Sequence, residues 1–196
     1  MMAAANETLV ERHGAALLEV AAAAIDYGLR QGREMPVDAA AYPPDLRTPG
    51  AAFVTLTIAG RLRGCIGSLE PFRPLVEDVA GNAHAAAFRD SRFDPVIADE
   101  RPQLDYSVSV LAEPEELHFA GEPELLAQLH AGRDGLIIRS RGRRALFLPR
   151  VWETLPEPEA FLYHLKAKAG LDAGRPADLD AWRFTVESVS SAGSSG

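Results

Sequence analysis

The stretch AAFVTLTIAGRLRGCIG, residues 51–67, predicts a β-hairpin, and the class of the fold follows from it. Its first half, residues 51–58, alternates aliphatic side chains with phenylalanine and threonine, which is the period-two pattern of a half-buried strand. The letters AGR then reverse the chain into LRGCIG, residues 62–67, where the only cysteine of the sequence lies between two glycines. Glycine usually weakens a strand, so its presence on both sides of Cys65 needs a physical reason.

Two turn lengths are compatible with this hairpin, and they direct the second strand differently. A two-residue loop at Ala59–Gly60 would place Arg61 and Arg63 on the apolar face of the first strand. A three-residue loop pairs Ile66 with Val54 and keeps apolar side chains together, so we prefer it. The other face of the hairpin then carries three neighbours from LRGCIG, which are Arg63, Cys65 and Gly67.

Helical and strand patterns surround this hairpin. Apolar residues at helical spacing predict helices at residues 6–31, 74–89, 123–131 and after 157. Period-two alternation predicts strands at 104–113 and 182–188, with a second hairpin at 135–149. Because hairpins dominate the strand pairing, we expect an α+β fold with a largely antiparallel sheet flanked by helices, and not a doubly wound parallel sheet.

The ends of these elements give further expectations. Asn6 is expected to cap the first helix and Gly32 to end it. The segment Thr154–Glu157 fits a capping box for the helix that follows. We expect a single domain over residues 1–187, followed by a flexible Gly/Ser-rich tail at 188–196.

The composition disfavours several classes of protein. A chain of 196 residues with 47% hydrophobic residues suits a globular core, and it has no run of the roughly 18 apolar residues that a membrane helix needs. The N-terminus lacks the pattern of a secretory signal, and one cysteine excludes an intrachain disulfide framework, so we expect a cytoplasmic protein. The net charge of −8 disfavours nucleic-acid binding. The one basic run, RSRGRR, predicts a solvated hairpin turn.

Cys65 has two interpretations. It is an inert core thiol in the first, because free cysteine is among the most frequently buried residue types. In the second it is a reactive thiol, because Arg63 on the same face could stabilise a thiolate. Gly64 and Gly67 would then leave open space above the strand for a ligand or a neighbouring backbone.

His84 is the natural base for a cysteine nucleophile, although it also fits a partly buried structural position at the edge of a helix. The remaining histidines have no metal-ligand spacing among themselves or with Cys65, so we expect no metal. The sequence has no phosphate loop and no dinucleotide fingerprint, so we expect no cofactor. After the same helix, Arg89, Asp90 and Arg92 form either a self-satisfied cap network or a wall that holds an anion.

Five segments carry a family resemblance. They are LRGCIG (62–67), AAAFRDSRFDPV (85–96), SVSVL (107–111), LPRV (148–151) and KAGL (168–171). In their order and spacing, over roughly residues 8–187, the sequence resembles the AMMECR domain family. Bacterial and archaeal members of that family are called protein A of the AmmeMemoRadiSam system, and they are associated with a Memo-like protein and a radical SAM protein.

The resemblance implies a two-lobed fold with a cleft, near which the LRGCIG motif lies. The resemblance implies that the site contains Arg63, Gly64, Cys65 and Gly67. Its wall would be formed by Arg89, Asp90 and Arg92. His84 falls where the family motif does not require histidine. The resemblance therefore implies an accessory or ligand-binding component that acts with the Memo-like and radical SAM proteins and takes an unknown small ligand. The alternative is an enzyme that uses Cys65 as its nucleophile.

Overall fold

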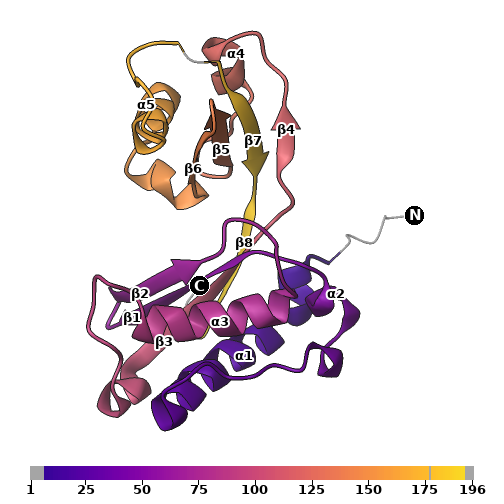
Figure 1. Ribbon diagram of the computed structural model, residues 1–196, viewed down its shortest axis with the longest axis vertical. Coiled ribbons are helices and arrows are strands. Elements are labelled where there is room, and N and C mark those ends of the chain that lie inside the picture. The colour runs from indigo at the N-terminus through magenta and orange to yellow at the C-terminus, as the bar shows by residue number, and fades with distance from the viewer. Residues whose placement is uncertain (1–6, 177, 193–196) are drawn as a thin grey trace. The chain divides into compact units, whose positions relative to one another are not determined.

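The structure, a computed structural model, describes residues 7–176 and 178–192. Figure 1 shows its elements, which belong to two units. Unit 1 contains the residues up to Val110 and those from Glu187 onward, and unit 2 is Leu111–Val186. Each unit has its own four-stranded sheet, and the strand pairs assigned in them are antiparallel. Two antiparallel sheets accompanied by helices confirm the predicted α+β class.

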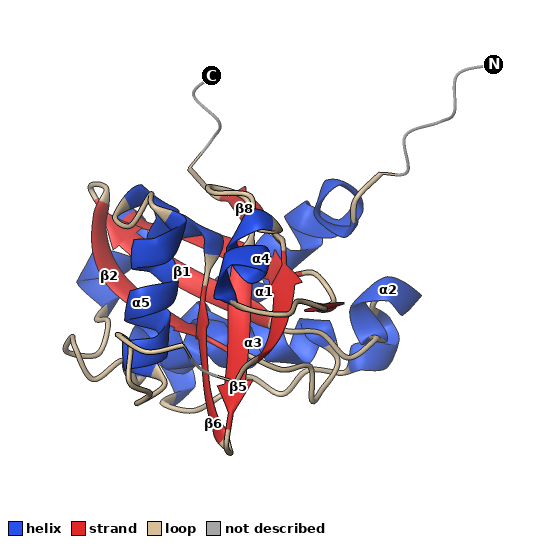
Figure 2. Ribbon diagram, turned by 90° about the horizontal axis from the view of Figure 1, so that it is seen from above, coloured by secondary structure: helices blue, strands red, loops and turns tan. Residues whose placement is uncertain are grey.

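Unit 1 places its strands in the order β2-β1-β3-β8. These strands are β1 Ala52–Ile58, β2 Arg61–Gly67, β3 Leu104–Leu111 and β8 Val186–Ser190. Its helices are α1 Leu9–Gln31, α2 Pro44–Arg47 and α3 Leu75–Phe88, with 3₁₀ turns η1 Ala39–Ala41 and η2 Ala98–Gln103. The two long helices, α1 and α3, pack side by side on one face of the sheet (Figure 1; strands red and helices blue in Figure 2).

The core of unit 1 lies between these two helices and the sheet. Val54 and Leu56 of β1 are fully buried there. Ala86 and Ala87 of α3 are buried as well, which confirms the small-residue stripe expected on that helix. Small side chains allow α3 to approach the sheet closely, and this approach limits the size of the side chains that β2 can carry on that face.

The hairpin combines features of both turn lengths. Its loop is the two-residue one, since Ile58 pairs with Arg61 and the intervening Ala59–Gly60 segment has positive φ at both positions. This backbone matches the primed turns that suit the right-handed twist of a hairpin. Farther along, Val54 nevertheless faces Ile66, as the three-residue alternative predicts.

A β-bulge reconciles these two registers. Leu56 and Thr57 are consecutive on β1, but they pair with Gly64 and Leu62, so Arg63 is an extra residue on β2. The bulge shifts β2 by one position and restores apolar pairing beyond it. The sequence predicted the pairing of Ile66 with Val54 correctly, but the length of the turn and the expected pairing of Leu62 with Ile58 were wrong, because Leu62 pairs with Thr57.

Unit 2 orders its strands β4-β7-β5-β6. They are β4 Glu115–Leu117, β5 Gly135–Ser140, β6 Arg143–Phe147 and β7 Asp180–Phe184. Its helices are α4 Glu122–Ala127 and α5 Pro158–Lys168, with the 3₁₀ turn η3 Pro149–Glu153. The predicted hairpin at 135–149 is confirmed, and its turn at Arg141 and Gly142 has positive φ at both residues.

The helix ends differ from expectation at two places. Thr8 caps α1 through a capping box with Glu11, whereas the predicted cap Asn6 lies outside the described residues. The predicted capping box at Thr154–Glu157 is wrong, because α5 begins at a proline and its first turn has no side-chain cap. The predicted stop at Gly32 is confirmed by its left-handed conformation.

The C-terminal strand also differs from the prediction. The strand expected at 182–188 is divided between β7, in the sheet of unit 2, and β8, in the sheet of unit 1. Val189 packs on Gly14 of α1, so residues 188–190 form a strand and not a flexible tail. The sequence did not predict this contact, because Val189 is the only apolar residue among residues 188–190. The last part of the expected tail, 193–196, lies outside the described residues.

Candidate functional site

Cys65 lies on the sheet face that is turned away from α1 and α3. Its neighbour Gly64 pairs with buried Leu56 on the helix side, and successive residues of a strand point to opposite faces. On the outer face Cys65 pairs with Thr55, which in turn pairs with Ser107. The Thr55 hydroxyl donates a hydrogen bond to the Cys65 sulfur at 3.3 Å. The thiol is thus half-buried in a row with two hydroxyls.

The glycines of LRGCIG are required by packing. A Cβ atom on Gly64 would collide with the backbone carbonyl oxygen of Ala86 in α3. A Cβ atom on Gly67 would collide with the ring of Phe53 on the neighbouring strand. The space that the sequence suggested for a ligand is therefore filled, by a helix backbone in one case and an aromatic ring in the other. This answers why glycines flank Cys65.

Asp90 fixes the backbone of Cys65 from the end of α3. The backbone N–H of Cys65 donates to the Asp90 carboxylate at 2.9 Å. Arg92 donates to both carboxylate oxygens, at 2.9 and 2.6 Å, and to the carbonyl oxygen of Cys65 at 3.3 Å. These bonds from Arg92 hold the pKa of Asp90 well below its usual range, although burial opposes the shift. We call Asp90, Arg92 and the backbone of Cys65 the Asp90 clamp.

Arg63, the extra residue of the bulge, is also committed to a partner. Its guanidinium makes two parallel hydrogen bonds to Glu100, at 2.8 and 2.9 Å, and a third to the carbonyl oxygen of Asp94. The hydrogen bond to Glu100 raises the pKa of Arg63, and the same bond lowers the pKa of Glu100. Arg63 therefore ties β2 to the connector that follows α3. The expected partnership with a Cys65 thiolate is replaced by this ion pair.

His84 lies on the helix side of the sheet, away from the Cys65 thiol. Its ring contacts Phe88 and the surface above Gly28 of α1. Its Nδ1 atom is buried and has no hydrogen-bond partner among the described residues, and it lies 4.0 Å from a carboxylate oxygen of Glu34. Burial lowers the pKa of His84. Arg89 joins the same group through a 3.0 Å ion pair with Glu34.

The predicted site residues thus separate into two groups. Arg63, Cys65, Asp90 and Arg92 gather around β2 and the connector after α3, where Asp90 bonds Cys65 and Arg92, and Arg63 bonds Glu100. His84 and Arg89 gather around Glu34 on the helix side. The sheet lies between the two groups, so His84 is not placed to act as a base for Cys65.

A buried aspartate that sequence reasoning missed organises the segment after LRGCIG. The carboxylate of Asp78, on α3, is 0% exposed and accepts four hydrogen bonds. Their donors are the backbone N–H of Ala52, the hydroxyl of Ser68, Nε of Arg73 and the amide of Asn82. We call this group the Asp78 clamp. In the sequence, Asp78 has the ordinary appearance of an acidic residue in the first turn of a helix.

The Asp78 clamp holds both ends of residues 68–73, which we call the 68–73 loop. Ser68 and Arg73 are bonded to Asp78, and backbone hydrogen bonds join Ser68 to Ala52 and Arg73 to Gly50. Between these anchored ends the loop presents two large apolar side chains to solvent. These side chains belong to Leu69, which is 47% exposed, and to Phe72, which is 67% exposed.

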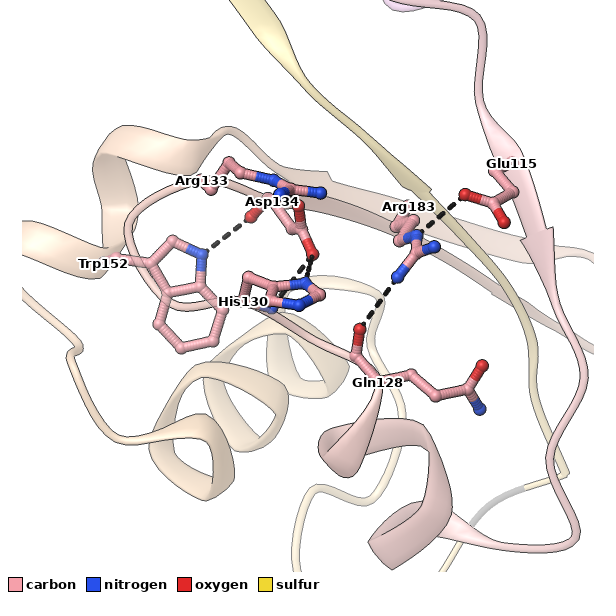
Figure 3. A network of polar contacts seen from close by, with 7 residues as sticks. All are labelled: Glu115, Gln128, His130, Arg133, Asp134, Trp152 and Arg183. Carbon is pink, nitrogen blue, oxygen red and sulfur yellow. Dashed lines mark hydrogen bonds and ion pairs between the residues drawn. The ribbon is translucent and has the colours of Figure 1, made fainter.

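A second polar network lies in unit 2 (Figure 3). Asp134, whose side chain is buried, accepts hydrogen bonds from the backbone N–H and from Nδ1 of His130, at 2.9 and 3.0 Å. Its backbone carbonyl accepts from the indole of Trp152, and Arg133 pairs with its carboxylate. Burial raises the pKa of Asp134, but the bonds from His130 and the charge and bond of Arg133 together outweigh it and leave the pKa below its usual value. This network closes the turn that leads into β5.

Within residues 7–176 and 178–192, no three side chains of His, Cys, Asp or Glu converge into a group that could hold a metal ion. No helix in that part of the chain combines the length and the hydropathy required to cross a membrane.

Comparison with known proteins places this geometry in a family. The AMMECR1 family model matches residues 18–189. A protein of Thermofilum pendens is 37% identical over 198 residues, which cover 91% of this chain and 90% of that protein. A protein of Methanothermobacter thermautotrophicus is 37% identical over 183 residues, covering 89% of this chain and 92% of its own. The resemblance seen in the five motifs is therefore confirmed over nearly the whole chain.

A solved structure shares the fold. The crystal structure of an uncharacterized protein from Pyrococcus horikoshii matches this chain with a TM-score of 0.78 and 35% sequence identity. The match covers 90% of each chain. It extends across both units, so the two-sheet α+β architecture is common to the two proteins.

Proposed function

We propose that this chain, which belongs to the AMMECR1 family, is a binding module that docks on partner proteins through the 68–73 loop. The partners in this proposal are the Memo-like protein and the radical SAM protein that the family resemblance implies. The module has no reaction of its own in this account. It recognises an apolar pocket on a partner and holds that partner in a fixed position.

The exposure of Phe72 on an anchored loop carries the proposal. A large aromatic side chain that is 67% exposed loses little by leaving water and gains a large apolar contact in a complex. The Asp78 clamp holds Ser68 and Arg73 before any partner arrives. Such preorganisation reduces the conformational entropy lost on binding, which is a feature of interface hot spots.

The neighbourhood of Cys65 supports binding more than catalysis. A nucleophilic thiol needs a base or a positive group directed at the sulfur. Arg63 and Arg92 make their ion pairs with Glu100 and Asp90, although Arg92 also interacts electrostatically with Cys65. The sulfur accepts a hydrogen bond from Thr55. A catalytic role for Cys65 would therefore need a base other than His84.

Titration of the full chain against purified Memo-like and radical SAM proteins from the same genome tests the proposal. Phe72→Ala should weaken the affinity about thirtyfold or more, the loss expected for a hot-spot residue. Tyr163→Ala is the matched control, because Tyr163 is 50% exposed but lies in unit 2. The proposal is wrong if wild type binds neither partner at about micromolar concentrations, or if both variants bind equally well.

A second variant separates binding from chemistry. Cys65→Ser should bind both partners as wild type does, because the thiol is half-buried and its loss changes little of the surface. It should also leave turnover of the reconstituted three-protein mixture unchanged. Loss of turnover with intact binding would favour the alternative in which Cys65 is a nucleophile.

A further inference from the structure

A small polar pocket lies beside the Asp78 clamp in unit 1. Its volume is about 230 Å³, which is below the roughly 300–1,000 Å³ of sites for drug-sized ligands. It is formed where the segment after α1 passes the first turns of α3, and it is lined by Glu34, Met35, Val37, Arg73, Glu77 and Gly81. Three of these six residues are charged, so the pocket suits a small charged or dipolar molecule.

Arg73 supplies the positive group of the pocket. Its Nε atom donates to Asp78, which fixes the guanidinium at the pocket wall. Its two terminal nitrogens lie against Gly81, where a Cβ atom would collide with them. Within the described residues, no side chain or carbonyl accepts a hydrogen bond from those nitrogens. They form a planar pair of donors, which matches the two oxygens of a carboxylate.

Glu77 and Glu34 supply the negative groups. Glu77 lines the pocket half-buried, and in the part of the chain that the structure describes it has neither an ion pair nor a hydrogen bond through its side chain. Glu34 is paired with Arg89, and the orphan Nδ1 atom of buried His84 lies 4.0 Å from it. His84 itself does not line the pocket, so of these groups only Glu34 and Glu77 offer it negative charge.

The charges select the class of ligand. Asp78 already balances Arg73, and Glu34 and Glu77 also line the pocket, so a multiply charged anion such as phosphate would be repelled. A simple cation would leave the terminal nitrogens of Arg73 without an acceptor. A molecule that carries one carboxylate and one ammonium group satisfies both walls.

We propose that this pocket binds a small zwitterion of the amino-acid type, with its carboxylate on Arg73 and its ammonium group on Glu77. Arg73 belongs to both the pocket and the 68–73 loop, because its Cζ atom also lies over the ring of Phe72, 4.8 Å from the ring centroid. The proposal does not depend on the docking function, because the ligand binds the chain without a partner.

Calorimetric titration of the full chain with the common L-amino acids, each up to about 10 mM, tests this proposal. At least one amino acid should bind. Its N-acetyl form, which lacks the ammonium group, and its methyl ester, which lacks the carboxylate, should each bind about tenfold more weakly or worse. Inorganic phosphate should not compete.

Two variants locate the site. Glu77→Gln should weaken the amino acid about tenfold while leaving the thermal midpoint unchanged, because Glu77 has no partner within the described chain. Glu19→Gln on α1, exposed and outside the pocket, is the matched control and should bind as wild type does. The proposal is overturned if no amino acid binds, if the blocked forms bind equally well, or if the two variants behave alike. Failure of partner docking alone would leave these binding results standing.

Discussion

The Asp90 clamp and the Asp78 clamp are built alike but end differently. In each, a buried carboxylate accepts a backbone N–H from the sheet and bonds an arginine nearby in the sequence. In the Asp90 clamp the arginine turns back to the carbonyl of Cys65 and closes the network. In the Asp78 clamp Arg73 keeps two nitrogens directed at a pocket and lies beside an exposed ring. The bonds of the Asp90 clamp stabilise the fold, whereas the Asp78 clamp leaves the terminal nitrogens of Arg73 available to a ligand.

Removal of the carboxylate at the centre of the Asp78 clamp should have the largest effect on stability. Asp78→Ala would remove the acceptor of the buried backbone N–H of Ala52 and of Nε of Arg73, together with one acceptor each of Ser68 and Asn82. Removing one partner of such a buried pair costs about 3–5 kcal/mol of unfolding free energy. Urea melts of the variant measure the loss. A loss below about 1 kcal/mol would mean that water replaces the carboxylate and that the loop is not held as described.

Gly64→Ala should perturb β2, the strand whose backbone the Asp90 clamp holds. The new methyl group would meet the carbonyl oxygen of Ala86, and a helix backbone cannot move aside cheaply. We expect a loss of about 3 kcal/mol. Gly67→Ala is the comparison, since the new methyl group meets the ring of Phe53, which can move only by a change of its whole rotamer, and a smaller loss than for Gly64→Ala should follow. Equal losses in thermal or urea melts would contradict the close approach of α3 to β2.

Asp90→Asn should reduce stability by about 1–3 kcal/mol near pH 7, because the bond between Asp90 and Arg92 loses its charge. The pKa of Asp90 is lower in the folded protein than in the unfolded chain. Its contribution is therefore present above the unfolded pKa, near 3.9, and is lost as the pH falls toward the folded pKa. Urea midpoints at about pH 7 and about pH 3 should show the gap between wild type and variant narrowing in acid. If the difference in urea midpoint between wild type and variant grew in acid, the pKa of Asp90 would be raised by folding and not lowered.

Cys65→Ser should have the smallest effect. The hydroxyl can keep the contact with Thr55, and the backbone of residue 65 stays bonded to Asp90. We expect a change in unfolding free energy below about 1 kcal/mol. A larger loss would show that the sulfur itself is part of the packing of the outer sheet face.

The sequence predicted the fold well where local patterns determine it. The alternation in residues 51–58, the stripe that contains Ala86 and Ala87, and the hairpin at 135–149 all follow from side-chain periodicity and turn residues. The division of the last strand could not be predicted, because alternation does not specify which sheet a strand joins. Whether residues 188–190 pair depends on Val189 meeting Gly14, a contact between distant parts of the chain.

The candidate site was predicted in part. The motifs around Cys65 and Asp90 lie together, but the sequence could not show that Arg63 is the extra residue of a bulge and pairs with Glu100. Asp78 gave no signal, since an acid in the first turn of a helix is usually exposed and its burial is a property of the tertiary fold. The segment SLEPFRP, which contains Phe72, has the composition of an ordinary loop. Its importance depends on what anchors it.

Residue-resolved amide hydrogen exchange of the chain, alone and saturated with a purified Memo-like or radical SAM partner, tests the docking account most directly. The account predicts that new protection is concentrated in residues 68–73, where Leu69 and Phe72 would enter the interface. Residues 62–67, already bonded within their sheet and to the Asp90 clamp, should change little. Protection confined to 62–67 and 89–94, with none in the 68–73 loop, would contradict the account and return the function to the surroundings of Cys65.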